Sequence, residues 1–504
     1  MMRQNFQHYV FVQLTLPKTV KAIRTDAGIS MQRKGGLGKL HKIASLLAYL
    51  LALAILLAPM PGSAQSDSPP SDVIGLTLKD AVRRALEYNR PLINQRSDRK
   101  VQRFSLEVSE DRWTPQFAVR PFASTDRQDR RAGVGAETSL RIFTGGQFVL
   151  RWDETLSDKS ADSGSQTLSF SQPLLKGAWP GIETASFRQQ QIQDRVYALA
   201  LRKAVEDLIV QVSRSYRALI AARRQVEIAE TALRRAEEQL QATRSLIRAG
   251  RVAQRETVRS ETTLANRELA LTQARNRLDS ANFDLIGILE LDSTVLVRPL
   301  DELKIQYRPD GLNPALEEVL HRRPDFLQAR LQVETAKIAL EVARNDLLPD
   351  LSLGLEWNRN DTGRTDTQVR VDANFPLTDR VDDLGHVRAK NDLRRAERNL
   401  AELRESIGIE VRQTVNDVEV GHRLTELARR ARELAAENLA VERKKFSQGL
   451  ASSFEVAAAE DDLVQTEQSE VTTIIAYLDA LTRLDQVSGR MLDLWNIRIE
   501  EVSQ

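Results

Sequence analysis

The chain has 504 residues, of which 28% are charged and 5% are aromatic, and its formal net charge at pH 7 is +2. It contains no cysteine, which excludes disulfides, thiolate metal sites and cysteine nucleophiles. Alanine, glutamate, leucine and arginine dominate long stretches, and this composition is typical of long helices rather than of a compact α/β enzyme.

The N-terminal region has the build of a secretory signal. A basic patch from Arg33 to Lys42 precedes an apolar run from Ile43 to Leu57. Gly62 and Ala64 then fit the small-residue positions of a cleavage site. About fifteen apolar residues are short for a membrane-spanning helix, so we predict a cleaved signal within residues 1–64 rather than an anchor. This segment has eight Lys and Arg and one Asp, which leaves 64 basic and 69 acidic residues and does not favour nucleic-acid binding.

The rest of the chain contains the same arrangement twice. In each copy a short amphipathic helix ends at an Arg-Pro step, at Pro91 in the first copy and at Pro324 in the second. A second helix then runs to another proline, Pro115 or Pro349. The predicted organisation is an N-terminal extension and signal over residues 1–64, a first repeat over residues 65–311, a second repeat over residues 312–497 and a tail over residues 498–504.

Strands are predicted after the second proline of each copy. Residues 116–122 and 351–357 carry apolar side chains at every second position, and residues 166–170 and 367–371 return with the same period. Strands of about ten residues suit a tilted span of a bilayer, although a soluble sheet has the same pattern. Residues 140–152 predict an additional hairpin, and the sequence leaves open whether it belongs to a barrel or hangs beneath it. Aromatic residues are expected near the strand ends, at Phe122, Trp152, Phe170 and Trp357.

Each copy continues as a long helical hairpin. Between Ile182 and Ala249 there is neither proline nor glycine, and a helix of this length would reach roughly 100 Å. Apolar residues recur with the spacing of a coiled coil. The seam residues are Leu201, Val205, Leu208, Val212, Tyr216 and Leu219 in the first copy, and they include Leu427, Ala431 and Leu434 in the second.

The hairpin tips are the most specific repeat in the chain. A glycine stands at each tip, where it can end a helix with a positive φ. Glutamates follow each glycine after six and eleven residues and a leucine after fourteen, all at one offset of 199 residues between the copies. The matched positions are Gly250 with Gly449, Glu256 with Glu455, Glu261 with Glu460, and Leu264 with Leu463.

This duplicated layout resembles the TolC-type family of outer-membrane efflux proteins, from about Leu76 to Ile497. The Arg-Pro helix ends, the prolines before the strands, the turns at Pro173 and Pro376 and the glycine tips carry the resemblance. It implies a mainly helical homotrimer whose strands form a twelve-stranded barrel in outer-membrane lipid, above a periplasmic tunnel of helices. It also implies a passive exit duct of a tripartite efflux or type I secretion system, which meets an inner-membrane transporter through a periplasmic adaptor.

The resemblance assigns two roles near the tips, adaptor docking and a pore gate. Acidic residues in the first turn of a helix also complement its dipole, which by itself explains Glu256 and Glu455. Ala451 and Ala458 stand where some relatives have an arginine and an acidic residue, so the gate of the family does not transfer intact. The candidate gate residues are Glu256, Glu455, Glu460 and Asp461, and the candidate docking residues are Arg248, Gly250, Arg251, Val252, Gln448, Gly449 and Ala451.

No catalytic, cofactor or metal site is predicted. The histidines beyond residue 64 are His321, His386 and His422, and none of them has metal-ligand spacing. Hydrolase and phosphate-binding motifs are missing from the sequence. The alternatives are a periplasmic coiled-coil adaptor, which would normally carry one hairpin, and a structural coiled coil with soluble sheets. The sequence leaves the cargo open among drugs, proteins, polysaccharides and metal ions.

Overall fold

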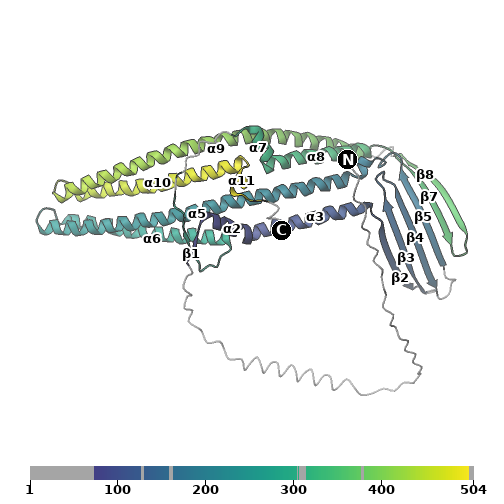
Figure 1. Ribbon diagram of the computed structural model, residues 1–504, viewed down its shortest axis with the longest axis horizontal. Coiled ribbons are helices and arrows are strands. Elements are labelled where there is room, and N and C mark those ends of the chain that lie inside the picture. Colours follow the sequence, from purple (N-terminus) through teal and green to yellow (C-terminus); the bar gives the residue numbers. More distant parts are fainter. Residues whose placement is uncertain are drawn as a thin grey trace, which may run out of the picture. The chain divides into compact units, whose positions relative to one another are not determined.

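A computed structural model describes residues 73–125, 130–157, 163–303, 305, 314–375 and 380–498. The predicted signal and the predicted boundary between residues 311 and 312 lie outside these ranges. Residues 70–504 form one compact unit, in which long helices run side by side and a six-stranded sheet lies at one end (Figure 1). Within the described ranges, no helix is long and apolar enough to cross a membrane.

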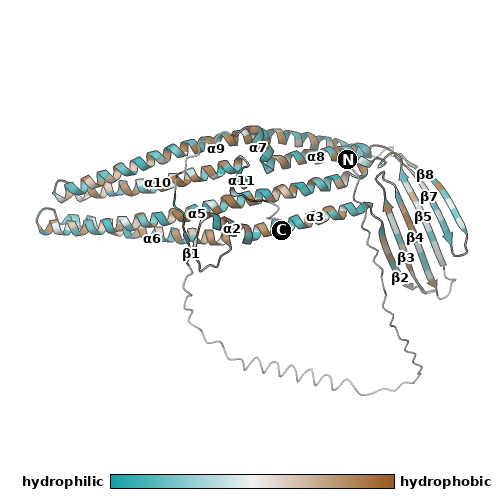
Figure 2. Cartoon of the chain, viewed as in Figure 1, coloured by the Kyte–Doolittle hydropathy of each residue, from teal (hydrophilic) through white to brown (hydrophobic). Residues whose placement is uncertain are grey.

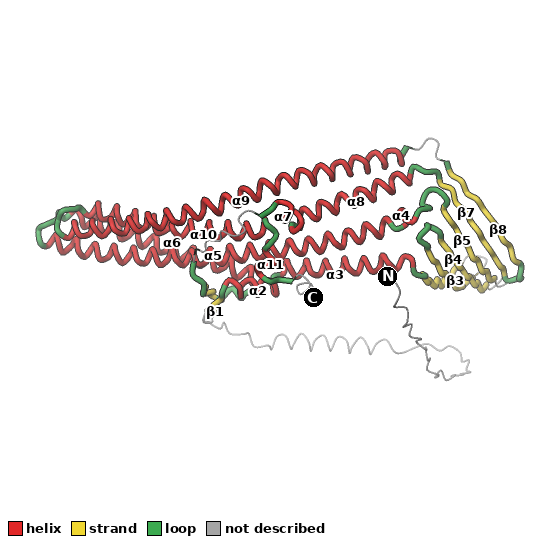
Figure 3. Tube along the Cα trace, turned by 45° about the horizontal axis from the view of Figure 1, so that its top comes forward, coloured by secondary structure: helices red, strands yellow, loops and turns green. Residues whose placement is uncertain are grey.

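The helices occur in the duplicated order that the sequence predicts, with the hairpin tips at the end away from the sheet (Figure 3). Helix α5 has 64 residues and therefore spans about 96 Å. The helices are α2 (Leu78–Tyr88), α3 (Arg90–Glu110), the 3-10 helix η1 (Asp111–Trp113), α4 (Pro180–Glu183), α5 (Ala185–Arg248), α6 (Arg255–Leu289), α7 (Leu316–Arg322), α8 (Pro324–Asp346), α9 (Val381–Ser447), α10 (Ser453–Val487) and α11 (Met491–Trp495).

The predicted Arg-Pro helix ends are confirmed, and each is a joint at which a new helix begins at once. Asn89 ends α2 and starts α3, because its side chain accepts a hydrogen bond from the Leu92 N–H at 3.2 Å. Pro91 fits the first turn of α3, where no intrahelical donor is needed. Arg323 occupies the equivalent joint between α7 and α8.

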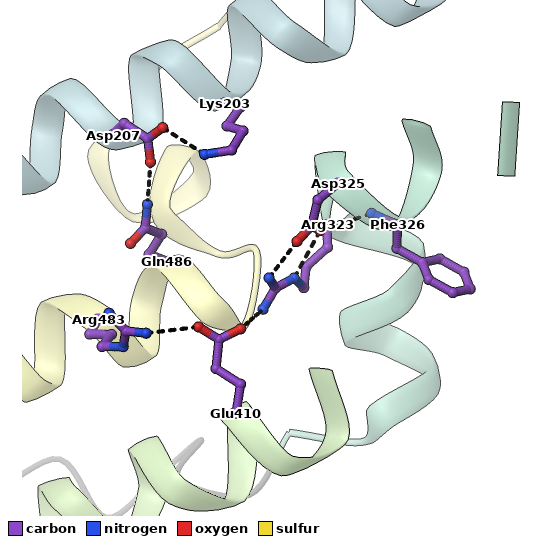
Figure 4. Close-up of polar contacts among 8 residues, drawn as sticks. All are labelled: Lys203, Asp207, Arg323, Asp325, Phe326, Glu410, Arg483 and Gln486. Atoms are coloured by element: carbon purple, nitrogen blue, oxygen red, sulfur yellow. Dashed lines mark hydrogen bonds and ion pairs between the residues drawn. The ribbon is translucent and has the colours of Figure 1, made fainter. Parts of the chain in front are cut away.

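The Arg323 joint connects α8 to the second hairpin (Figure 4). Its guanidinium binds Asp325 at 2.5 Å and Glu410 of α9 at 2.7 Å, and Arg483 of α10 binds the other oxygen of Glu410 at 2.9 Å. Burial acts to raise the pKa of Asp325, but the Arg323 guanidinium outweighs burial and holds this pKa below its ordinary value. These short, charge-assisted contacts therefore fix the position of α9 and α10 relative to the joint between α7 and α8.

The large sheet is antiparallel throughout, in the order β2-β3-β4-β5-β7-β8. The additional hairpin predicted at residues 140–152 is the junction of β3 and β4, and both strands pair within this sheet. Three chains of a twelve-stranded barrel would contribute four strands each, whereas this sheet has six. The strands are β1 (Val73–Leu76), β2 (Gln116–Thr125), β3 (Arg130–Arg141), β4 (Gln147–Ser157), β5 (Ser163–Pro173), β6 (Leu296–Pro299), β7 (Asp350–Asn360) and β8 (Thr365–Asn374).

One face of the sheet is apolar and the other is polar. Residues that lie opposite each other on neighbouring strands share a face. Phe170 lies opposite Phe148 and Leu355, and Leu355 lies opposite Val369. Hydrophobic residues recur along the strands of the sheet in Figure 2. Trp152 is on the same face but stands in the middle of β4, which corrects its predicted place near a strand end.

The seam predicted for α5 is confirmed, because all six of its residues from Leu201 to Leu219 are buried. The seam predicted for α9 differs. Leu427 and Leu434 are 57% and 55% exposed, and Ala435, Leu439 and Phe446 are the residues that α9 buries in the cluster it shares with α10. The apolar stripe of Leu427 and Leu434 therefore lies on a face of α9 that the described part of the chain leaves open.

A small parallel sheet of β1 and β6 was not predicted, and it packs around Tyr216 of α5. The Tyr216 hydroxyl lies 2.9 Å from the Leu76 carbonyl oxygen and 2.9 Å from Asp301 Oδ2, and it accepts a bond from the Asp301 N–H at 3.3 Å. Burial raises the pKa of Tyr216 to about 12. The hydroxyl thus links β1 and the segment after β6 to the long helix.

Replacing Tyr216 with Phe should lower the free energy of unfolding by about 0.5–1.5 kcal/mol, because the partly buried partners at Leu76 and Asp301 lose hydrogen bonds. Since the folded chain holds the Tyr216 proton more tightly, the wild type should also lose stability as the pH rises from 10 to about 12. Denaturant unfolding in detergent measures both effects. Tyr197→Phe, at a half-buried position of the same helix, is the control, and equal losses in both variants would contradict this role of Tyr216.

Candidate functional site

The two hairpin tips have the same backbone structure. Gly250 has a φ of +70°, and its N–H donates to the Ile247 carbonyl at 2.9 Å while the Arg251 N–H donates to Leu246 at 3.0 Å. Equivalent bonds surround Gly449, whose φ is +81°. This pattern caps a helix C-terminus and needs a left-handed residue, for which glycine has the lowest steric cost. The predicted helix-ending glycines are thus confirmed.

The tips project freely within the described part of the chain. A Cβ built on Gly250 or on Gly449 would meet no atom within 4 Å. Beside the second glycine, Leu450 is 74% exposed and Phe454 is 57% exposed. Sequence reasoning missed Phe454, although a large apolar side chain at a polar tip is a usable signal. Among the candidate docking residues, Arg248, Gly250, Arg251, Gln448 and Gly449 are exposed, and Val252 and Ala451 are half-buried.

Glu256 and Glu455 stand at matched positions but make different contacts. Glu455 accepts from the Ser452 N–H at 2.6 Å in a capping box, and this hydrogen bond lowers its pKa. The equivalent of Ser452 in the first copy is Ala253, which has no side-chain oxygen to form such a box. Glu256 instead accepts a hydrogen bond from the Ser453 hydroxyl of the other hairpin.

Glu460 is buried between helices of both hairpins, with 5% of its surface exposed. Arg235 Nη1 of α5 lies 3.0 Å from Glu460 Oε1, without the alignment of a hydrogen bond, and Arg443 Nη2 of α9 lies 3.4 Å from Oε2. Burial raises the pKa of Glu460, even though the neighbouring arginines act to lower it. The adjacent Asp461 forms an ion pair with Arg267 of α6.

The repeat explains part of this cluster. Arg244 and Glu261 of the first hairpin form an exposed ion pair at 2.9 Å, and Arg443 and Glu460 are their equivalents at the offset of 199 residues. Glu460 of the second pair is buried because α10 packs against α5, which also brings Arg235 to Glu460, while Arg443 is half-buried. Sequence reasoning identified both glutamates and missed the arginines, which the same offset could have revealed.

The four candidate gate residues are therefore all bound by protein partners. Glu256, Glu460 and Asp461 join the first hairpin to the second, whereas Glu455 only caps its own helix. Glu460 is buried, and a buried carboxylate without a cationic partner would be strongly unfavourable, so Arg235 and Arg443 stabilise it between the helices, whereas the Asp461 side chain is largely exposed. The contacts of Glu256, Glu460 and Asp461 thus form a polar connection between the two hairpins, which we call the polar lock.

Replacing Glu460 with Gln should change the pH dependence of stability. The raised pKa means that the folded chain binds this proton more tightly than the unfolded chain, so the contribution of Glu460 to stability falls as the pH rises above 4.5. As the pH rises above 4.5, the unfolding free energy of the wild type minus that of the variant should therefore decrease. Glu261→Gln at the exposed equivalent is the control, and the same trend in both variants would contradict burial as its cause.

The combination of two long helical hairpins with matching tips and an antiparallel sheet with one apolar face defines an outer-membrane efflux channel. The family model described as "Outer membrane efflux protein" matches residues 81–289 and 315–490. The chain belongs to this family. The membership confirms the predicted family, efflux-channel function and outer-membrane location over the adaptor and structural alternatives.

Individual proteins show the same likeness. The chain is similar to the pyoverdine export outer membrane protein OpmQ of Pseudomonas putida, with 23% identity over 70% of this chain and 76% of OpmQ. It is 26% identical to the alkaline protease secretion protein AprF of Pseudomonas aeruginosa, over 42% of this chain and 44% of AprF. Its fold matches the crystal structure of the Campylobacter jejuni CmeC outer membrane channel with a TM-score of 0.65 and 14% identity, over 85% of this chain and 89% of CmeC.

Proposed function

We propose that three copies of this chain form a passive exit duct through the outer membrane, which receives its cargo from an inner-membrane transporter through a periplasmic adaptor. The duct itself performs no catalytic step. The observation that carries the assembly is an apolar stripe on α9 with no partner in the described part of the chain. Its residues are Val420, Leu424, Leu427, Leu434 and Val441, all 44–57% exposed.

The spacing of this stripe supports a helical partner from a second copy. Its residues follow each other at intervals of four, three, seven and seven, which is the rhythm of a coiled-coil seam. An amphipathic helix gains stability from such a face only when the face is buried against another helix. The outer strands β2 and β8 likewise pair on one side only within the described sheet, and unpaired strand edges are not tolerated in lipid. Both features favour closure by neighbouring copies, as the family resemblance implies.

The tips are the proposed adaptor-docking surface. Arg248 and Arg251 supply positive charge there, and Leu450 and Phe454 supply exposed apolar area. A partner that offers apolar and acidic side chains on a helical hairpin would complement both. The small open turn at each glycine allows close approach of a partner backbone.

Replacing Gly250 or Gly449 with Val should abolish export while trimers still reach the outer membrane, because a β-branched residue strains the left-handed turn that shapes each tip. Export of cargo and the salt-resistant trimer band in outer-membrane fractions are the two readouts. Gly363→Val is the matched control, since Gly363 also has a positive φ of +76° and open space but lies between β7 and β8. Normal export by both tip variants would overturn the docking assignment.

The polar lock between the hairpins is the proposed periplasmic gate. Opening the tip requires the second hairpin to move away from the first, and that movement breaks the contacts of Arg267 with Asp461, of Arg235 with Glu460 and of Ser453 with Glu256. An adaptor bound at the tips could offset this cost through its own contacts. The acidic side chains released by opening would then face the passage and favour cations.

Replacing Arg267 with Gln should raise the conductance of purified channels in planar bilayers by several-fold, because one ion pair between the hairpins is lost. Arg244→Gln is the matched control, since its ion pair with Glu261 lies within the first hairpin. Unchanged conductance in the Arg267 variant would contradict the gate, and an equal rise in both variants would indicate general loosening of the first hairpin.

The names of the relatives cover two kinds of cargo, pyoverdine for OpmQ and an alkaline protease for AprF. We propose that the cargo is selected by the inner-membrane partner, because the cavity lined by Arg235, Arg443 and Glu460 has a volume of only about 20 Å³, which is room for about one water molecule.

A further inference from the structure

We infer that the transmembrane wall of the assembled channel has eighteen strands, six from each chain. The inference rests on the proposed trimer and extends it to the number of strands. Its basis is the β3–β4 hairpin, which stands in the sheet between β2 and β5. A twelve-stranded wall built by three chains would have to exclude this hairpin.

The hairpin is a full member of the sheet. Its strands β3 and β4 have 12 and 11 residues, so they are as long as the other strands of the sheet. β3 pairs with β2 from Arg130 to Ser139 and with β4 from Arg131 to Arg141. On the other side, β4 pairs with β5 from Gln147 to Thr155. Removing the hairpin from the wall would break two continuous hydrogen-bonded ladders, which lipid cannot replace.

The turn of the hairpin is held at the junction between the sheet and the helices. The ring of Phe143 lies 5.1 Å from the ring of Trp113, and Gln172 Nε2 donates to the Thr144 carbonyl at 2.8 Å. A Cβ on Gly145 would lie only 2.4 Å from the Gly177 carbonyl oxygen, so the backbones approach closely here. These contacts fix the turn in the wall rather than beneath it.

Both faces of the hairpin continue the faces of the remaining strands. Leu150 lies opposite Leu168, which lies opposite Trp357, in one apolar row across β4, β5 and β7. Val149 lies opposite Ser169, and Ser169 lies opposite Glu356, in the adjacent row of the polar face. A hairpin outside the lipid would have no reason to carry the same outward apolar row.

The two edges of the sheet suit closure by a copy of the same chain. Strand β2 leaves the helices after α3 and η1, whereas β8 returns to them before α9, so these edge strands run in opposite directions. The β8 strand of one copy can therefore pair in antiparallel fashion with β2 of the next. Because each chain contributes an even number of strands, the strand directions alternate without interruption around the closed barrel.

Six strands also match the width of the helices below them. α3, α5, α8 and α9 pack in this order and join β2, β5, β7 and β8 in the same order. Four packed helices cover an arc of about 40 Å at an axial spacing of about 10 Å. Six strands spaced about 4.8 Å apart and tilted by about 40° cover about 38 Å, whereas four would cover only about 25 Å. The additional hairpin thus fills the arc that the helices set.

The number of strands determines the diameter of the outer opening. With the same spacing and tilt, eighteen strands close at a backbone diameter of about 36 Å, against about 24 Å for twelve. The outer end would then be about as wide as the helical section, and among the described residues the narrowing would lie at the hairpin tips.

The absence of cysteine from the chain allows a direct test by cysteine accessibility. In intact outer membranes of cells that express single-cysteine variants, Val149→Cys should react with a water-soluble maleimide and Leu150→Cys should not. The matched pair on β7, Glu356→Cys and Leu355→Cys, should show the same alternation. Reaction at both β4 positions with alternation retained on β7 would place the hairpin outside the wall and overturn the inference.

The same samples separate this inference from the proposed function. If neither strand alternates, the sheet does not line a membrane channel and the proposed function itself fails. Native mass spectrometry of the detergent-extracted complex then counts the chains. Three chains with alternation on β4 give eighteen strands, whereas two chains would give twelve and overturn the inference.

Discussion

A strand in lipid cannot leave its backbone N–H and C=O groups unpaired, and this constraint orders the whole chain. Each inner strand of the described sheet satisfies it within the chain, and in the proposed assembly β2 and β8 would satisfy it by pairing with another copy. A corresponding constraint applies to the helices, because an apolar helix face stabilises the fold only when another helix buries it. α5 buries its seam within the chain, while α9 keeps a stripe open toward its surroundings. In the proposed assembly, neighbouring copies would therefore cover both the strand edges and the helix stripes, so the wall and the tunnel would form together.

The local features of the fold were predictable from the sequence because local chemistry determines them. Pro91 and Pro324 restrict the residue before them, and Gly250 and Gly449 supply the positive φ of a helix end. Features that depend on distant partners were less predictable. The alternating residues around 140–152 indicated a hairpin, but the pairing of β5 with β7 joins strands from the two halves of the duplicated chain, and no local pattern indicates it.

The same distinction holds for the candidate site. The stripe of Leu427 and Leu434 was visible in the sequence, but periodicity does not say which helix covers it. Glu460 was visible through the repeat, yet its burial follows from the packing of α10 on α5, which also brings Arg235 to it. The four-residue strands β1 and β6 are too short to show a period, so their pairing around Tyr216 had no signal in the pattern.

One cap residue accounts for the different contacts that two matched glutamates make in the two halves of the duplicated chain. Ser452 engages Glu455 locally, while the alanine at position 253 leaves Glu256 available to the other hairpin. If the two halves were identical, the three chains of the proposed trimer would have six equivalent helical hairpins around the mouth. With this difference the six hairpins of the proposed trimer alternate between one whose glutamate caps its own helix and one whose glutamate bonds to the other hairpin. The Ser452 hydroxyl, which has no counterpart at Ala253, is thus one of the differences that would give the mouth threefold rather than sixfold symmetry.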